Sequence, residues 1–225
     1  MRFDDALGQL RDLPTPLPAG PARIEPSVLE RGLAAPGMVV NDKATRREAA
    51  ALVLLYPDAA GVAHIVLTVR PDGDHVHAGQ VALPGGKREA SDAWPVGTAL
   101  REASEEVGLD AAAAGVETLG LLDSVNVRVS GFLMVPVLAV ARSEPALVAD
   151  EREVARLLCV PVAHFLPGAP VEMVDERRGG WHLRYGAYPV DGHRVWGATA
   201  RVLGQLGAIL EPAGAGYQGS PSVSS

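Results

Sequence analysis

The 225-residue chain has a net charge of −7, an apolar fraction of 48% and a charged fraction of 21%, as soluble globular proteins do. This length fits one sizeable domain with extensions and can bury a core. The negative charge argues against a nucleic-acid or anionic-membrane surface, since such surfaces need basic patches. It does not exclude a small anionic ligand, because a bound cation can reverse the local sign.

The single cysteine, Cys159, excludes an intramolecular disulfide and suits a reducing compartment. Within RLLCVPV we expect it to be a small buried apolar residue and not a nucleophile. The N-terminus MRFDDALGQL has acids where a signal peptide needs an apolar core. The longest apolar run, residues 131–141, is too short to span a bilayer. The sequence therefore predicts a cytoplasmic protein with no membrane partner.

The first half of the chain contains two helical patterns and three strand patterns. Residues 3–12 predict a short helix and 13–22 a Pro-rich connector, both within an N-terminal extension, residues 1–45. Apolar runs at 50–56 and 64–70 predict two buried strands joined by a turn, and a shorter strand is predicted at 79–84. A helix is predicted at 92–107, where Ser91 or Asp92 can cap the start, Pro95 falls in the first turn and Gly108 ends it.

The second half continues this interleaving of strands and helices. Strands are predicted near 116–122 and 131–140, a helical stretch around 150–158, strands at 171–174 and 181–190, and a final helix at about 197–210. Residues 212–225 are small, polar and rich in Pro and Gly, so we expect disorder there. The main domain, residues 46–211, is therefore an α/β or α+β layered fold.

The predicted helix at 92–107 has three glutamates, Glu102, Glu105 and Glu106, within little more than one turn. On a helical wheel they lie opposite the apolar stripe. An ordinary solvated face is the simplest interpretation, but such faces usually intersperse lysines at i+4, and this helix has none. Arg101 can pair with Glu105, which leaves Glu102 and Glu106 pointing the same way with no partner in the sequence. Adjacent carboxylates of this kind are ligands for Mg²⁺ or Mn²⁺.

A pair of glycines, Gly85 and Gly86, precedes this helix at the end of a predicted strand. Bare backbone at such a position can approach a phosphate, and a glycine carbonyl can add a metal ligand. Alone, the pair indicates only a turn. Together with the acidic helix it indicates a site for a metal and a phosphate.

The segment REASEEVGL, residues 101–109, resembles the second half of the Nudix signature, G-x5-E-x7-R-E-U-x-E-E-x-G-U with U aliphatic. In the first half, Asp92 takes the place of the first glutamate, and one extra residue separates it from Arg101. The resemblance implies a Nudix fold, an α/β/α sandwich with a central mixed sheet, in which the acidic face turns toward a metal-filled cleft.

The longer loop and Asp92 are similar to the coenzyme A pyrophosphatase branch of that family. Upstream, VLTVRPDGDHVHAGQVALPGG resembles the branch motif L-L-T-x-R-S-x-x-L-R-x-H-x-G-Q-V-x-F-P-G-G. Pro71, Asp74 and His75 differ from that motif where contacts to the coenzyme would be expected. An acid at 74 and the loss of a basic residue at 75 could weaken recognition of a 3′-phosphate. The resemblance extends over roughly residues 47–210.

The resemblance implies metal-dependent hydrolysis of a pyrophosphate linked to a nucleoside. For coenzyme A or its thioesters, the products would be 3′,5′-ADP and (acyl-)4′-phosphopantetheine. Mg²⁺ or Mn²⁺ would be held by Glu102 and Glu106, assisted by Glu105 and the Gly86 carbonyl, and would lower the pKa of an attacking water. NADH and ADP-ribose are the rival substrates. A non-catalytic nucleotide-binding regulator is a further alternative, although we would expect its acids to be eroded.

Several further residues are candidates for the site. The general base would be Glu105 or an acid of the later segment, with Glu153 in the predicted catalytic set beside Glu105, Glu106 and Arg101, and with Asp150 and Glu151 as alternatives. Asp150, Glu151 and Glu153 could equally well be acids that favour a helix N-terminus. The predicted substrate-binding residues are Arg70, His77, Gly85, Gly86 and Lys87. The expected partner is a small nucleotide, and a homodimer is left open.

Overall fold

Strand β2 (Arg47–Pro57) is the centre of the fold, because its residues 49–56 are all buried. Strands covered on both faces show such continuous apolar runs. The computed structural model describes residues 1–31, 47–73, 78–127, 130–178 and 181–211. Strand β2 pairs in parallel with β8 (Phe132–Val140) and antiparallel with β3 (Ala63–Val69) and β5 (Gly85–Lys87).

The described strands form two sheets. The larger one runs β4–β3–β2–β8–β6, with β5 beside β2, β7 beside β8 and β9 beside β3. Its shorter strands are β4 (Val81–Ala82), β6 (Glu117–Leu121), β7 (Val125–Val127) and β9 (Arg156–Pro161). The smaller sheet contains β1 (Ser27–Arg31), β10 (Glu172–Arg178), β11 (Trp181–Val190) and β12 (His193–Val195).

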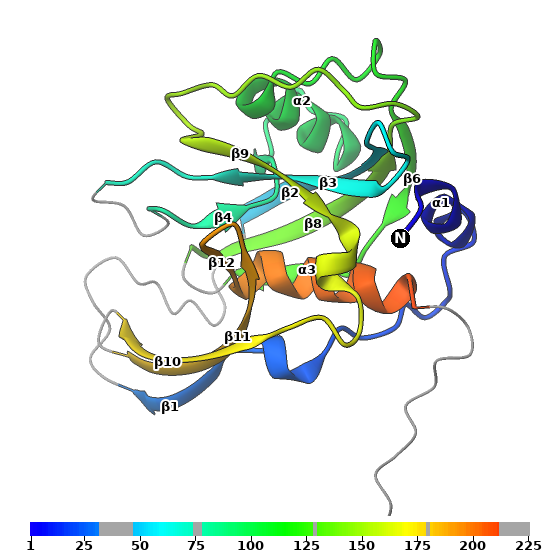
Figure 1. Cartoon of the computed structure of the whole chain (residues 1–225). Helices are drawn as coiled ribbons and strands as arrows, with labels where there is room; N and C mark the ends of the chain where they lie inside the picture. The colour runs from blue at the N-terminus through cyan, green and yellow to red at the C-terminus, as the bar shows by residue number, and fades with distance from the viewer. Residues whose placement is uncertain (32–46, 74–77, 128–129, 179–180, 212–225) are drawn as a thin grey trace, which may run out of the picture.

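Helices cover both faces of the larger sheet (Figure 1). Helix α2 (Val96–Val107) packs on the face formed by Ala50, Leu52 and Leu54 of β2. Helices α1 (Phe3–Leu10) and α3 (Gly197–Ile209) pack with the alternate residues Val53 and Leu55. Two short 3₁₀ helices, η1 (Ala22–Ile24) and η2 (Val162–Phe165), complete the second layer. The predicted α/β/α sandwich with a central mixed sheet is confirmed.

The start of the acidic helix was predicted four residues too early. Helix α2 begins at Val96, and its N-cap residue is Pro95, with no side-chain cap. Asp92 does not cap the helix, because its carboxylate accepts hydrogen bonds from Thr98 and Arg101 instead. The strand predicted at 79–84 is also shorter, with only Val81–Ala82 in β4.

The helical stretch predicted around 150–158 is wrong. Residues 151–153 form a turn, and the chain then enters β9, which pairs antiparallel with β3 along its whole length. Leu158 and Val160 are buried, whereas Cys159 between them is exposed. The expectation of a buried cysteine is therefore also wrong, because alternation along a strand turns Cys159 away from the core.

The described part of the N-terminal segment belongs to the main core. Phe3, Leu7, Leu10 and Ile24 pack in the same cluster as residues of α3, and β1 pairs with β11. Residues 32–45 and the tail at 212–225 lie outside the described residues, so the boundaries at 45/46 and 211/212 stay predictions. None of the described helices is long and apolar enough to cross a membrane.

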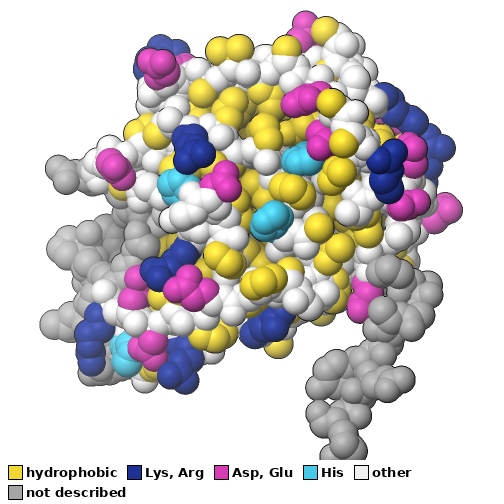
Figure 2. All heavy atoms as spheres, viewed as in Figure 1, with side chains coloured by type: hydrophobic (Ala, Val, Ile, Leu, Met, Phe, Trp, Pro, Cys, Tyr) yellow, Lys and Arg dark blue, Asp and Glu magenta, His cyan; other side chains and the backbone are white. Residues whose placement is uncertain are grey.

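Charge is distributed without a dominant sign on the face seen in Figure 2. Basic and acidic side chains lie next to one another there, between stretches of apolar surface. Exposed side chains of the protein also form ion pairs, as in Arg194–Glu172 at 2.7 Å. Exposed pairs of this kind contribute about 0–1 kcal/mol each, so the fold depends mainly on its apolar layers.

The contribution of α1 to the core can be measured. Leu10→Ala should lower the free energy of unfolding by about 2–5 kcal/mol, because Leu10 is fully buried and the truncation leaves a cavity. Urea denaturation followed by circular dichroism measures this change. Arg11→Gln, at an exposed position next to the helix, is the control and should change the value by less than about 0.5 kcal/mol. An equally small effect of Leu10→Ala would contradict the structure.

Candidate functional site

Helix α2 places two glutamate carboxylates against the glycine strand β5. The backbone N–H of Gly85 donates a hydrogen bond to Oε2 of Glu106 at 3.0 Å, and Glu106 is only 4% exposed. A Cβ at Gly86 would lie 2.5 Å from the carboxylate of Glu102. The carboxylate of Glu102 therefore lies where a side chain at Gly86 would otherwise be, and that of Glu106 contacts the backbone of the same strand.

Close packing requires glycine at both positions of this strand. A Cβ at Gly85 would meet the carbonyl oxygen of Ala50 at 2.5 Å, and one at Gly86 would displace the carboxylate of Glu102. Contacts this short force backbone or side chains to move. The glycine pair thus brings the strand backbone, the sheet and the acids of α2 into direct contact.

Arg101 links the acids of α2 to the loop before the helix. Its guanidinium donates to Oε2 of Glu105 at 2.8 Å and to Oε1 of Glu102 at 2.9 Å. It also donates to the carbonyl oxygen of Lys87 at 2.9 Å. The predicted Arg101–Glu105 pair is present, but Glu102 is also paired, so the expectation that it lacks a partner is wrong.

Asp92 holds Arg101 in this orientation, and sequence reasoning missed its role. The carboxylate of Asp92 accepts from Nε and Nη2 of Arg101 at 3.0 and 3.1 Å, from Thr98 Oγ1 at 2.8 Å and from the backbone N–H of Glu89 at 2.8 Å. The hydrogen bonds from Arg101, followed by the one from Glu89, hold the pKa of Asp92 well below its usual range. The sequence places Asp92 and Arg101 at matching positions of the Nudix signature, but nothing in it shows that their side chains pair.

Burial raises the pKa of Glu106 to about 7, while the Gly85 N–H and the charge of Arg70 oppose the rise. The negative charges of Glu102 and Glu153 add to it. Burial is also the main cause that raises the pKa of Glu102, against the opposing effect of Arg101. Ionisation of Glu102 and Glu106 is therefore unfavourable in this buried position, and a nearby cation would make it less so.

The loop that carries Glu153 is fixed to the end of α2 and to β3. Asp150 donates its backbone N–H to the carbonyl oxygen of Glu106 at 2.9 Å, and Ala155 donates to that of Val69 at 2.8 Å. This brings Glu153 near Glu102 and Glu106, whose pKa values its charge raises.

The other two acids of this loop, Asp150 and Glu151, differ from Glu153. The carboxylate of Asp150 accepts hydrogen bonds from the guanidinium of Arg152 and, with a smaller effect, from its backbone N–H, and these lower the pKa of Asp150 to about 2. Glu151 is exposed, and its charge is not among the causes that raise the pKa values of Glu102 and Glu106. Among the acids of this loop, Glu153 is therefore the one whose charge acts on the buried carboxylates of Glu102 and Glu106.

The remaining predicted site residues lie at different places. Arg70 is close enough for its charge to act on Glu106, whereas the side chain of Lys87 is exposed. Glu105 is 56% exposed at its side chain and faces Arg101 more than the buried pair. His77 lies in the segment 74–77, outside the described residues.

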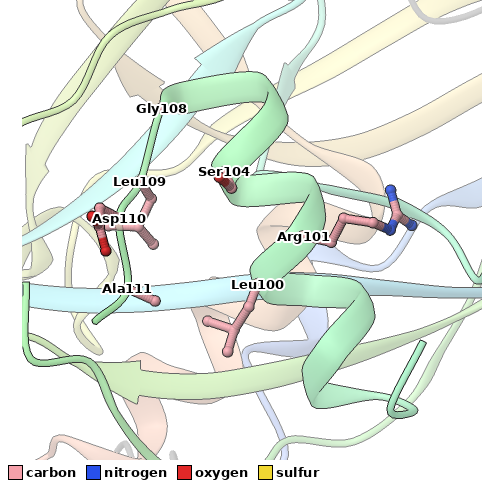
Figure 3. A pocket seen from close by; sticks show the side chains of 7 residues that line it. All are labelled: Leu100, Arg101, Ser104, Gly108, Leu109, Asp110 and Ala111. Atoms are coloured by element: carbon pink, nitrogen blue, oxygen red, sulfur yellow. The ribbon is translucent and has the colours of Figure 1, made fainter. Parts of the chain in front are cut away.

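No group of three or more His, Cys, Asp or Glu side chains in the described part of the chain is arranged to hold a metal ion. A hollow of about 380 Å³ lies beside α2, lined by Leu100, Arg101, Ser104 and residues 108–111. Figure 3 shows the side chain of Arg101 pointing away from Leu109, Asp110 and Ala111, which line this hollow. Glu102 and Glu106 do not line it, so the hollow and the buried acids of α2 are separate features.

With this geometry established, comparison with known proteins gives a clear result. The model of the NUDIX domain matches residues 45–176, more than half of the chain. The chain belongs to the Nudix family. Nudix hydrolases act on phosphorus anhydrides and generally use divalent metal cations. The matched segment ends inside β10. Strands β11 and β12 and helix α3 follow it in the chain and belong to the same folded structure.

Curated Nudix relatives cover much of the chain. A protein named "Uncharacterized Nudix hydrolase NudL" from Yersinia enterocolitica is 36% identical over 142 residues, which is 63% of this chain and 71% of the relative. One of the same name from Yersinia pestis is 33% identical over 165 residues, 72% of this chain and 79% of the relative. Among solved structures, the Nudix hydrolase RenU from M. smegmatis is 29% identical with a TM-score of 0.45, covering 53% of this chain and 73% of its own.

The Asp92–Arg101 contact predicts a pH-dependent contribution to stability. A carboxylate whose folded-state pKa is lowered stabilises the fold above its unfolded pKa, and this contribution is lost as the pH falls through the folded-state pKa. Asp92→Asn should therefore be less stable than the wild type near neutral pH, and the difference should shrink below about pH 4. Urea denaturation across pH 2.5–7 measures it, with Asp12→Asn at an exposed position as control. A difference that stays constant with pH would contradict this interpretation.

Proposed function

We propose that this Nudix protein hydrolyses the pyrophosphate bond of coenzyme A or its thioesters and releases 3′,5′-ADP and (acyl-)4′-phosphopantetheine. The observation that carries the hydrolase part is the convergence of Glu102 and Glu106 on the glycine strand, with Arg70 beside them. The coenzyme part is supported by the motif at 66–86. The altered residues Pro71, Asp74 and His75 favour NADH or ADP-ribose as the second candidate.

The donor set of the site fits a hard divalent cation such as Mg²⁺ or Mn²⁺. Glu102 and Glu106 would hold it through carboxylate oxygens, which these ions prefer, and the carbonyl of Gly86 and the carboxylate of Glu105 would assist. The raised pKa values of the buried pair support this assignment, because burial penalises the charged form of each carboxylate and a bound cation would offset that penalty. When bound, the cation would neutralise the diphosphate and lower the pKa of a water.

Residues of the chain then have separate roles around the diphosphate. Arg70 is placed to donate to phosphate oxygens, since its charge reaches the position of Glu106. Arg101 keeps Glu102 and Glu105 oriented through its hydrogen bonds and does not itself contact substrate in this proposal. The bare backbone of Gly85 and Gly86 lets the carboxylates of Glu102 and Glu106 approach the strand.

Glu153 is the general base that we favour over Glu105. Its charge acts on both buried carboxylates, whereas Glu105 is held by Arg101. A base beside the carboxylate pair would accept the proton of the attacking water. The loop hydrogen bonds at Asp150 and Ala155 hold Glu153 at this edge of the site.

The reaction is tested by product analysis with coenzyme A, NADH and ADP-ribose, each with Mg²⁺ and with Mn²⁺. Coenzyme A should give 3′,5′-ADP and 4′-phosphopantetheine at the highest kcat/KM of the three. Glu106→Gln should lower kcat/KM by about a thousandfold or more, since it removes a charged ligand while keeping an acceptor for Gly85. Cleavage that persists in this variant would refute the mechanism. Preferential cleavage of NADH or ADP-ribose would refute the coenzyme assignment.

Exchange of neighbouring acids tests the general base. Glu153→Gln should lower kcat by about 10²-fold to 10⁴-fold with a smaller effect on KM, because proton transfer is lost while substrate contacts remain. Glu151→Gln is the matched control in the same exposed turn and should retain kcat within about threefold. Initial-rate measurements at saturating metal give both values. Equal losses in the two variants would remove Glu153 as the base.

Metal binding should depend on pH through Glu106. Its pKa, raised to about 7 in the metal-free protein, means that the metal-binding carboxylate is increasingly populated as the pH rises through 7. Added Mn²⁺ should therefore raise the melting temperature more at pH 8 than at pH 6, because a ligand of the folded state stabilises it. EDTA should reverse the shift, and Glu106→Gln should lack it. A shift of the same size at both pH values would contradict the assignment.

A further inference from the structure

The end of helix α2 is bonded to the segment that leads into β9. Helix α2 ends at Val107, so its last carbonyl oxygens have no partner within the helix. The backbone N–H of Val148 donates to the carbonyl oxygen of Val107 at 2.9 Å, and that of Asp150 donates to the carbonyl oxygen of Glu106 at 2.9 Å. Figure 1 shows this segment running past α2 before it enters β9. Glu106, which carries a buried carboxylate, is thus joined through its backbone to Asp150.

Asp150 also closes the turn that carries Glu153. Its carbonyl oxygen accepts from the backbone N–H of Glu153 at 2.9 Å and from that of Val154 at 2.8 Å. Its carboxylate oxygen Oδ1 accepts from the backbone N–H of Arg152 at 3.0 Å. An aspartate that binds the backbone two residues later stabilises a tight turn. Val154 is 1% exposed, so the end of the turn is fixed in the protein interior.

The side chain of Asp150 is engaged by Arg152. The guanidinium Nε of Arg152 donates to both carboxylate oxygens of Asp150, at 3.0 and 3.2 Å. The side chain of Arg152 is 86% exposed, whereas that of Asp150 is only 23% exposed. The charge of Asp150 is not among the causes that raise the pKa values of Glu102 and Glu106. The hydrogen bonds of Asp150 therefore fit a role in shaping the turn, and not the role of a proton acceptor.

We propose that Asp150 is a positioning residue, which ties the turn of Glu153 to the end of α2 and so fixes the proton acceptor relative to the buried carboxylates. The inference rests on the proposed function, in which Glu153 is the general base. The backbone N–H of Asp150 is bonded to Glu106, and its carbonyl and carboxylate oxygens bind the turn. A general base must lie within hydrogen-bond reach of the water that it deprotonates. A displacement of about 1 Å can lower a rate by up to about 10²-fold.

Truncation of the Asp150 side chain tests this role. Asp150→Ala should lower kcat about tenfold and leave KM within about twofold, because the base is displaced while substrate contacts remain. Asp150→Asn keeps an acceptor for the backbone N–H of Arg152 and should retain kcat within about threefold of the wild type. The substrate is whichever of coenzyme A, NADH and ADP-ribose is cleaved fastest. An unchanged kcat in Asp150→Ala, or an equal loss in Asp150→Asn, would overturn the proposal.

Asp58→Ala is the matched control for the loss of a turn. The carboxylate of Asp58 accepts from the backbone N–H groups of Ala60 and Val62 in the connection between β2 and β3. This turn follows the end of β2, whereas β5 pairs with residues 49–51 near the start of that strand. Asp58→Ala should therefore keep kcat within about twofold. A tenfold loss in this variant would attribute the effect of Asp150→Ala to general loosening of the fold and would overturn the proposal.

A double-mutant cycle with Glu153→Gln separates positioning of the base from other effects of Asp150. Once the proton acceptor is removed, its position no longer affects the reaction. Asp150→Ala should therefore lower kcat by less than about twofold when it is introduced into Glu153→Gln. A further tenfold loss in the double variant would show that Asp150 acts on another group, and would overturn the proposal.

Hydrogen exchange measures the turn without any turnover of substrate. The backbone N–H groups of Arg152, Glu153 and Val154 should exchange about tenfold faster in Asp150→Ala, because the carboxylate that closes the turn is lost. Asp150→Asn should exchange at nearly the wild-type rate, and the amides of the turn at Asp58 should be unaffected in both variants. Exchange that is unchanged in Asp150→Ala would overturn the positioning role.

The two measurements distinguish failure of this inference from failure of the proposed function. If Glu153→Gln loses kcat but exchange and kcat are unchanged in Asp150→Ala, only the positioning role fails. If Glu153→Gln retains kcat, the assignment of the base fails and the positioning role fails with it. Faster exchange together with a tenfold lower kcat in Asp150→Ala, rescued by Asp150→Asn, is the result that we expect.

Discussion

The burial of two carboxylates against a strand of bare backbone is the constraint on which the site depends. An ionised group removed from water is costly unless hydrogen bonds or opposite charges compensate it. Glu106 has one backbone donor, Gly85, and the more distant charge of Arg70, while Glu102 has Arg101. This compensation is incomplete, and burial raises the pKa of both acids. A cation bound beside these two acids, as we propose, would reduce the cost of their burial.

The surrounding structure follows from this constraint. Glycines at 85 and 86 are needed because any side chain would displace the carboxylate of Glu102 or clash with β2. Asp92 and the fully buried Thr98 fix Arg101, so that its guanidinium can reach the acids of α2 and the carbonyl of Lys87 together. Hydrogen bonds of this kind behind a site keep the side chains that would contact a ligand in position.

The sequence predicted the elements that depend on local pattern and missed those that depend on tertiary contacts. Helical spacing identified the acidic face of α2 and the Arg101–Glu105 pair, and apolar runs identified β2, β3 and β8. The stretch at 150–158 was misassigned because its acids favour a helix start, whereas pairing with β3 decides its structure. The role of Asp92 was missed for a similar reason, since only the folded loop brings it to Arg101.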